Sequence, residues 1–173
     1  MRRHIFSLCI CSIFSISPFA PSLADAAADK GAVQVKGTGT DLLNEAIVHV
    51  KKTTPTGEIQ KSTEIVELRG DLNGKVLYHV TTLIDNKKGT LVNTGDQVFS
   101  GTILGSEPVM IHDSKFRFEV DLATGADHGS VYLFDRIAGP KVRCTLKITG
   151  TGKNAEANPT FSYAGTCSFA GGR

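Results

Sequence analysis

Hydrophobic and polar residues alternate with a period close to two along most of this chain. The clearest example is residues 141–149, which contain the run Val142-Arg143-Cys144-Thr145-Leu146-Lys147-Ile148-Thr149. The same alternation recurs in residues 115–121 and 159–169. Because successive side chains of a β-strand point to opposite faces, each segment predicts a strand with one buried and one solvated face.

The alternating segments are separated by turns rich in Gly, Pro and Asn, which supply the dihedral angles that tight turns need. The strands predicted in this way are residues 44–53, 58–68, 74–84, 89–94, 97–105, 108–112, 115–121, 128–135, 141–149 and 159–169. Only residues 41–46 could form a helix, and that stretch is short. This spacing predicts an all-β fold, an antiparallel up-and-down β-barrel of about eight strands. A β-sandwich is the alternative, since it produces the same alternation, but closure into a barrel removes the two exposed edges of a long meander.

Residues 74–84 depart from simple alternation because both faces carry apolar side chains. Val76, Tyr78 and Val80 mark one face, whereas Leu77 and Leu83 mark the other. We therefore expect this strand either to be covered on both faces or to face a cavity that is not fully polar.

The first 24 residues have the features of a secretory signal peptide. Met1, Arg2 and Arg3 begin a short positive segment, residues 5–20 are apolar, and small residues suited to cleavage follow. An uncleaved anchor is the alternative, but the apolar run is shorter than the roughly 20 residues that a membrane span needs. The expected organisation is a signal peptide (1–24), a flexible lead-in (25–43) and one β-barrel domain (44–173), with no membrane span after cleavage and a periplasmic or secreted location.

Charge and composition exclude several partner classes. The whole chain has 19 Lys and Arg against 17 Asp and Glu. Loss of Arg2 and Arg3 with the signal peptide makes the mature chain close to neutral, and no basic block remains. We therefore expect no nucleic-acid partner, and charge offers no support for binding to an anionic membrane surface. The oligomeric state stays open.

Two cysteines, Cys144 and Cys167, remain after cleavage, and both lie on the apolar face of a predicted strand. If residues 141–149 and 159–169 form a hairpin, the register that opposes the cysteines also opposes Leu146 to Gly165 and Ile148 to Tyr163. That register predicts a cross-strand disulfide, which an oxidising compartment would preserve. The alternatives are a redox-active pair or half of a metal site, but the chain has no Cys-x-x-Cys motif.

Recognisable catalytic chemistry is missing from the sequence. It contains no nucleophile elbow, no phosphate loop and no metal-ligand spacing, so we expect no metal and no cofactor, and the catalytic residues are unknown. His112 and His128 flank the predicted strand 115–121 and can be neighbours in space. They are either two polar turn residues or the start of a metal or acid–base site.

Tyrosines are the best candidates for polar groups inside a barrel. Tyr78 and Tyr163 each share a strand face with apolar residues, so their hydroxyls either point into a cavity or are hydrogen-bonded within the core. If a cavity exists, we expect its ligand-binding wall to contain Tyr78, Val80, Phe118, Leu146 and Tyr163.

Part of the chain resembles a known family. The segments 95–101, 143–153 and 161–167 contain Gly95-Asp96-Gln97, Gly150-Thr151-Gly152-Lys153 and Gly165-Thr166-Cys167. They resemble exported bacterial proteins of the allene oxide cyclase-barrel type, which share a calycin-like barrel with the plant cyclases and the dirigent proteins. The resemblance implies the barrel fold. It does not carry over an activity, because the catalytic residues of the plant enzymes match no position in this chain.

Three functions fit these observations. The first is an exported, non-catalytic barrel that binds a small, mostly apolar ligand. The second is an isomerase or cyclase of the allene oxide cyclase-like type, which needs little beyond confinement and one or two polar groups in the cavity. The third is a structural or interaction protein of the cell envelope, which would use an exposed strand edge or an apolar patch.

Overall fold

The computed structural model describes residues 31–170, so the predicted signal peptide and the first part of the lead-in lie outside the described residues. The described chain is almost entirely β-structure, with one short 3-10 helix, η1 (Leu43–Glu45). Its strands are β1 (Ala32–Asp41), β2 (Ile47–Thr54), β3 (Gly57–Gly70), β4 (Leu72–Asp85), β5 (Thr90–Ile103), β6 (Val109–Asp113), β7 (Arg117–Asp121), β8 (Asp127–Leu133), β9 (Asp135–Ala138), β10 (Val142–Lys153) and β11 (Pro159–Phe169). The predicted all-β class is confirmed.

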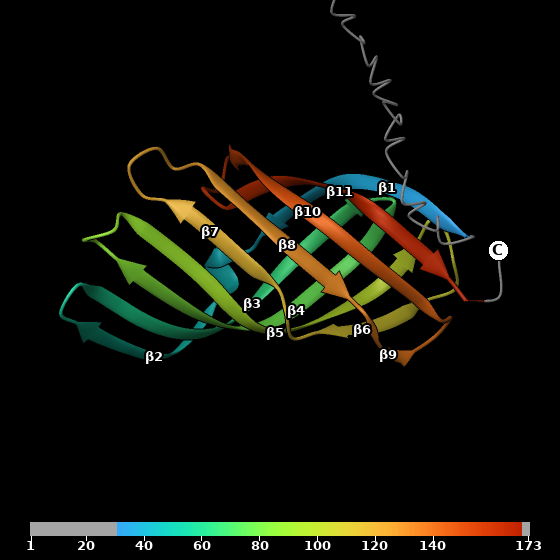
Figure 1. Ribbon diagram of the computed structural model, residues 1–173, viewed down its shortest axis with the longest axis horizontal. Coiled ribbons are helices and arrows are strands. Elements are labelled where there is room, and N and C mark those ends of the chain that lie inside the picture. Colours follow the sequence, from blue (N-terminus) through green and yellow to red (C-terminus); the bar gives the residue numbers. More distant parts are fainter. Residues whose placement is uncertain (1–30, 171–173) are drawn as a thin grey trace, which may run out of the picture.

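Eight of these strands close into an antiparallel barrel (Figure 1). Around the ring the order is β1, β3, β4, β5, β7, β8, β10 and β11, and it closes because β11 pairs with β1. Ala32 lies opposite Ser168 at one end of this closing pair and Thr40 lies opposite Thr160 at the other. The barrel prediction is therefore confirmed over the sandwich.

Three further strands extend the barrel wall. β2 pairs with the first half of β3, whereas β1 pairs with the second half of β3. β6 pairs with β5, and β9 pairs with β6. The strand paired with this edge of β3 therefore changes from β2 to β1 along its length. In the chain, η1 connects β1 and β2, where this change of partner occurs.

The prediction of a flexible lead-in over residues 25–43 is wrong for residues 32–41, which form β1 at the centre of the closed wall. Val33 and Val35 alternate with polar residues at the start of this strand, but Gly37 and Gly39 occupy the next two inward positions, so the apolar alternation stops there. A Cβ atom on Gly37 would overlap the Tyr163 ring, and one on Gly39 would overlap the Phe161 ring. The bulk of these positions is therefore supplied by aromatic rings of β11, which local sequence cannot reveal.

The β10–β11 hairpin forms in the expected register. Cys144 lies opposite Cys167, Leu146 opposite Gly165 and Ile148 opposite Tyr163. Cys144 and Cys167 are joined by a disulfide across a Cα–Cα distance of 4.1 Å. The predicted disulfide and its register are confirmed.

Two predicted strand boundaries differ from the structure. The segments 89–94 and 97–105 are one strand, β5, which passes through Gly95 at a φ of 151°. In that conformation glycine carries the chain through without the strain that a side chain would cause. The segment 128–135 instead divides into β8 and β9, because β8 pairs with β10 while β9 pairs with β6.

The interior consists of a packed half and a hollow half. In the packed half, fully buried side chains such as Leu72, Phe99, Ile103 and Ile111 belong to one hydrophobic core cluster with the two disulfide cysteines. The hollow half lies toward the end where the β2–β3, β4–β5 and β7–β8 turns meet, at the left of Figure 1. The packed half closes one end of the barrel, so that any space inside lies in the other half.

Residues 74–84, now part of β4, show why both faces carried apolar residues. The inward side chains of Val76 and Tyr78 face the hollow half, so the second of the two explanations, a strand that faces a cavity, applies. The outer face is not covered, since Leu77 and Leu83 are 50% and 44% exposed.

Within residues 31–170, no helix has the length and apolar character needed to cross a membrane.

Candidate functional site

The hollow half of the barrel contains a cavity of about 320 Å³ whose wall is mostly apolar. Every strand of the closed ring contributes to this wall, together with Leu43 of η1. Val131 of β8, Leu146 of β10 and Phe118 of β7 are typical of its surface. Such a space can take a small molecule that is largely hydrocarbon.

Three acidic or phenolic side chains meet on this wall. Glu64 lies directly opposite Tyr78 in the β3–β4 ladder, and Asp41 at the end of β1 lies opposite Val66, the next inward residue of β3. The Tyr78 hydroxyl donates a hydrogen bond to Asp41 Oδ2 at 3.3 Å. Ser62 donates a hydrogen bond of 2.6 Å to Glu64 Oε1. We call Asp41, Glu64 and Tyr78 the acidic cluster.

Burial changes the proton affinities in the acidic cluster. Burial, and secondly the negative charge of Glu64, raise the pKa of Asp41 from 3.8 to about 7, although the hydrogen bond from Tyr78 opposes this. The pKa of the Tyr78 phenol is raised well above its usual value, chiefly by burial and then by the charges of Asp41 and Glu64. Near neutral pH, Asp41 can therefore exchange a proton while Tyr78 remains a hydrogen-bond donor.

Two acceptor atoms on the cavity wall have no hydrogen-bond partner among the described residues. They are Oδ1 of Asp41 and Oδ1 of Asn93, and both atoms are buried. Buried polar atoms are normally paired, and an unpaired one in a native fold requires an explanation. A third buried unpaired atom among the described residues, Thr54 Oγ1, lies at the end of β2 and outside the lining of this cavity.

Next to the acidic cluster, Asp113 of β6 has a structural role. Its carboxylate accepts hydrogen bonds from Gln97 Nε2 at 2.9 Å, from the Tyr132 N–H at 2.8 Å and from the Lys115 N–H at 2.6 Å. It thereby ties β6 to β5 and β8. It also holds the Gln97 side chain, which lines the cavity, in place.

The predicted ligand-binding residues divide into two groups. Tyr78, Phe118 and Leu146 lie on the cavity wall, whereas Val80 and Tyr163 are not among its lining residues. Val80 and Tyr163 are each 2% exposed and belong to the core.

Tyr163 is excluded from the cavity by its hydrogen bonds. Its hydroxyl accepts a 2.7 Å bond from the Leu72 N–H and lies 3.2 Å from the Arg69 carbonyl oxygen. The β1–β11 register places the ring beside Gly37, toward the packed half. Tyr163 therefore follows the second of the two roles considered for it, a core tyrosine with a satisfied hydroxyl.

Two members of the acidic cluster were missed from sequence. Asp41 fell in the segment that was expected to be a flexible lead-in. Glu64 carried a usable signal, because it interrupts an alternating series in which Ser62, Val66 and Leu68 also point inward and are buried. A single acid at an inward position of a predicted strand marks a cavity or a buried polar pair.

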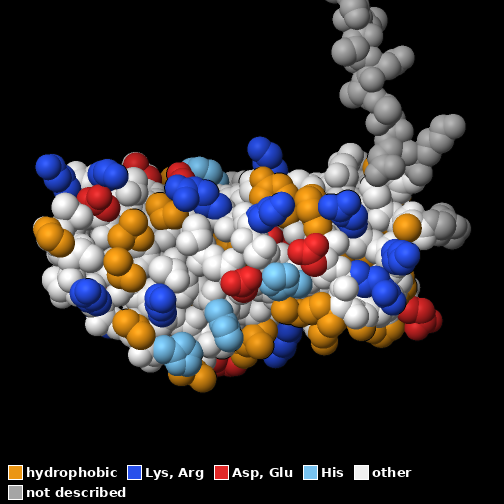
Figure 2. Space-filling model, turned by 60° about the horizontal axis from the view of Figure 1, so that its bottom comes forward, with side chains coloured by type: hydrophobic (Ala, Val, Ile, Leu, Met, Phe, Trp, Pro, Cys, Tyr) orange, Lys and Arg blue, Asp and Glu red, His pale blue; other side chains and the backbone are white. Residues whose placement is uncertain are grey.

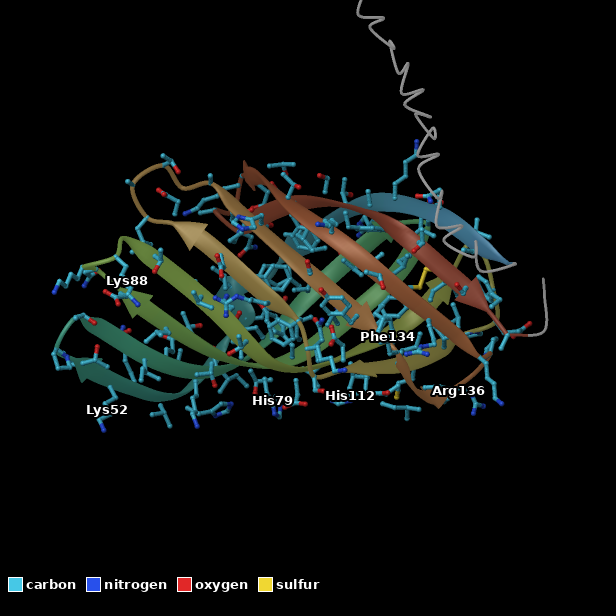
Figure 3. All side chains as sticks on the ribbon, viewed as in Figure 1. Lys52, His79, Lys88, His112, Phe134 and Arg136 are labelled. Carbon is cyan, nitrogen blue, oxygen red and sulfur yellow. A yellow bond between two sulfur atoms is a disulfide. The ribbon has the colours of Figure 1, made fainter. Side chains whose placement is uncertain are left out.

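The histidines next to residues 115–121 are not brought together. His112 Nε2 lies 3.0 Å from Asp96 Oδ1, whereas His128 Nε2 lies 3.9 Å from Glu119 Oε2. His79 and His112 lie on the outer side of the barrel (Figure 3). Within residues 31–170 no group of three or more His, Cys, Asp or Glu side chains could hold a metal ion.

The outer surface has two further features. A groove of about 430 Å³ beside β9, β10 and β11 is lined by Arg136, Lys141 and Arg143. The Arg143 guanidinium lies 4.3 Å from the centre of the Phe134 ring. Apolar side chains and histidines gather on the face that comes forward in Figure 2, and the exposed residues of β4, β6 and β9 include Leu77, Met110 and Ile137. Both features lie on the outer surface, whereas the acidic cluster lies on the inner wall of the barrel.

Comparisons with protein families, with curated proteins and with solved structures each found no match to this chain. The chemistry of the site must therefore be argued from the cavity and its side chains.

Proposed function

We propose that this chain is an exported barrel protein that binds a small, mostly apolar ligand in the cavity of its hollow half. The observation that carries the proposal is the division of the barrel interior. The packed half provides stability, and the hollow half keeps a cavity of about 320 Å³ lined mostly by apolar side chains. Pockets that hold small molecules usually start at roughly 300 Å³ and combine an apolar wall with a few polar groups.

The compartment is part of this proposal. A disulfide between Cys144 and Cys167 is compatible with an oxidising, exported environment. The periplasm or the extracellular medium is the expected location, in agreement with the signal peptide predicted for residues 1–24. The resemblance to the allene oxide cyclase-barrel family is likewise proposed, and the calycin-like architecture it implies agrees with a ligand in the barrel.

A second candidate function is an isomerase or cyclase, and the acidic cluster favours it. Asp41, with a pKa of about 7, can accept or return a proton, and the Tyr78 hydroxyl can donate a hydrogen bond to a polarised oxygen. Both lie on an apolar wall, where a reactive substrate would be held in one conformation. The envelope interaction protein remains a third candidate, supported by the apolar residues exposed on the outer face.

Native mass spectrometry of the protein purified from its natural source tests the binding function. We expect a reproducible non-covalent adduct on the wild-type protein that disappears under denaturing conditions. The denatured mass also reports the cleavage site and the disulfide.

A cavity-filling variant shows where such an adduct lies. Val131→Phe places a larger side chain in the cavity wall, whereas Val50→Phe makes the same change on the exposed strand β2. We expect loss of the adduct in Val131→Phe and its retention in Val50→Phe. A wild-type protein without an adduct, or an adduct that survives in both variants, would contradict ligand binding in this cavity.

A further inference from the structure

The charged groups that line the cavity all carry the same sign. Asp41, Glu64 and Asp127 contribute carboxyl groups, and none of the lining residues within the described chain is Lys, Arg or His. Glu64 is only 4% exposed. Its described hydrogen bond comes from a neutral hydroxyl, that of Ser62, rather than from a cation. Buried carboxylates are normally paired with cations, so this cavity lacks the positive charge that its acids would attract.

The hydrogen-bonding groups of the cavity wall also leave acceptors, and not donors, without a partner among the described residues. The Tyr78 hydroxyl is a donor, but it is directed to Asp41 Oδ2. Asp41 Oδ1 and Asn93 Oδ1 remain buried acceptors without a partner among the described residues. These unpaired acceptors are a second observation, separate from the charges, that favours a ligand with hydrogen-bond donors.

The lack of positive charge on the wall and the unpaired acceptors together indicate the class of ligand. A fatty acid or another anion would bring a further negative charge next to Asp41 and Glu64 and would repel both. An alcohol offers only one hydrogen-bond donor. An ammonium group offers three donors and the complementary charge, and a hydrocarbon chain attached to it matches the apolar wall around Val131 and Leu146.

We propose that the cavity binds an amphiphilic aliphatic amine in its ammonium form, with the ammonium group at Asp41 and Glu64 and the hydrocarbon against the apolar wall. This inference rests on the proposed binding function and specifies its ligand class. A bound ammonium group would lower the raised pKa of Asp41, because it would stabilise the ionised form of this carboxyl.

Three probes with the same hydrocarbon chain test the proposal: octylamine, octanol and octanoate. Their binding to the wild-type protein is measured by isothermal titration calorimetry at about pH 8, where Asp41 is mostly ionised and octylamine is protonated. We expect octylamine to bind at least about tenfold more tightly than octanol, and octanoate to bind most weakly.

Charge-neutral variants of the acidic cluster localise this preference. In Asp41→Asn and in Glu64→Gln, octylamine affinity should fall to about the level of octanol, while octanol affinity stays within about twofold of the wild-type value. Glu67→Gln is the matched control, because Glu67 lies on the same strand as Glu64 but points outward and pairs with Arg69 at 2.9 Å. A cooperative thermal melt of each variant confirms that it is folded.

The outcomes separate the two proposals. If octanol or octanoate binds as tightly as octylamine, the ligand class is wrong and the binding function stands. If Glu67→Gln weakens octylamine binding as much as Glu64→Gln does, surface attraction explains the preference and the proposed site is wrong. If none of the three probes binds to the folded wild-type protein, the binding function itself is contradicted.

Discussion

Replacing Asp41 by asparagine should change how the stability of the barrel depends on pH. The folded protein holds this carboxyl with a pKa of about 7, against an ordinary value of 3.8. Between these two values the folded state binds a proton that the unfolded state has released. The free energy of unfolding contributed by Asp41 therefore falls as pH rises from about 4 to about 7 and is constant at higher pH.

The size of the effect follows from the same two values. A pKa difference of this size corresponds to at most about 4 kcal/mol, and partial solvent access at Asp41 reduces the expected change to about 2–4 kcal/mol. An asparagine side chain cannot ionise, so the Asp41→Asn protein avoids this loss. The variant should therefore gain about 2–4 kcal/mol relative to the wild type on going from about pH 4 to about pH 8.

Urea denaturation at a series of pH values measures this difference with the disulfide intact in both proteins. Contributions from titrating groups that are not coupled to Asp41 cancel to first order when the two curves are subtracted. Glu107→Gln is the control, because Glu107 is exposed in the loop between β5 and β6. The reasoning is refuted if the difference between wild type and Asp41→Asn is independent of pH, or if it grows in the opposite direction.

Three further predictions follow from the described contacts. Removing the charge of Glu64 with Glu64→Gln should lower the pKa of Asp41 from about 7 toward its usual value, which carboxyl NMR titration measures. An unchanged pKa would exclude electrostatic coupling between Glu64 and Asp41. Replacing Cys144 and Cys167 by alanine should reduce the free energy of unfolding by about 3 kcal/mol, because the disulfide closes a loop with a sequence separation of 23. Equal urea midpoints for this variant and the oxidised wild type would contradict this prediction. Ala157 has a φ of 63°, so Ala157→Gly should relieve backbone strain and raise the free energy of unfolding by about 0.5–1 kcal/mol in the same assay. A lower urea midpoint would show that the turn is not strained.

Much of the fold was predictable because strand formation and hairpin register leave local traces. Alternation in residues 141–149 and 159–169 identified β10 and β11, and the two cysteines identified their register. β1 left only a short trace, the alternation of Val33 and Val35 with polar residues, because Gly37 and Gly39 occupy the next inward positions, where a core strand would normally carry apolar side chains. Missing β1 also meant missing Asp41, the residue at its end.

The candidate site was predictable only in part. Inward-facing residues could be assigned from alternation, which is why Tyr78, Phe118 and Leu146 were expected to face inward, and these three line the cavity. Alternation does not say where along the barrel a residue lies. Val80 and Tyr163 therefore share the inward face with the lining residues, although the structure buries them in the core.

The strands with sustained alternation, their inward faces and the β10–β11 pairing were predictable from the sequence, because they depend on side-chain period and on contacts between neighbours in the chain. Where the interior is packed and where it is hollow depends instead on how the closed barrel brings distant strands together. Closure of β1 between β3 and β11 brings Asp41 to the same wall as Glu64 and Tyr78. The proton affinity of Asp41 then depends on burial and on a charge from another strand, which are properties of the closed barrel and of no single segment.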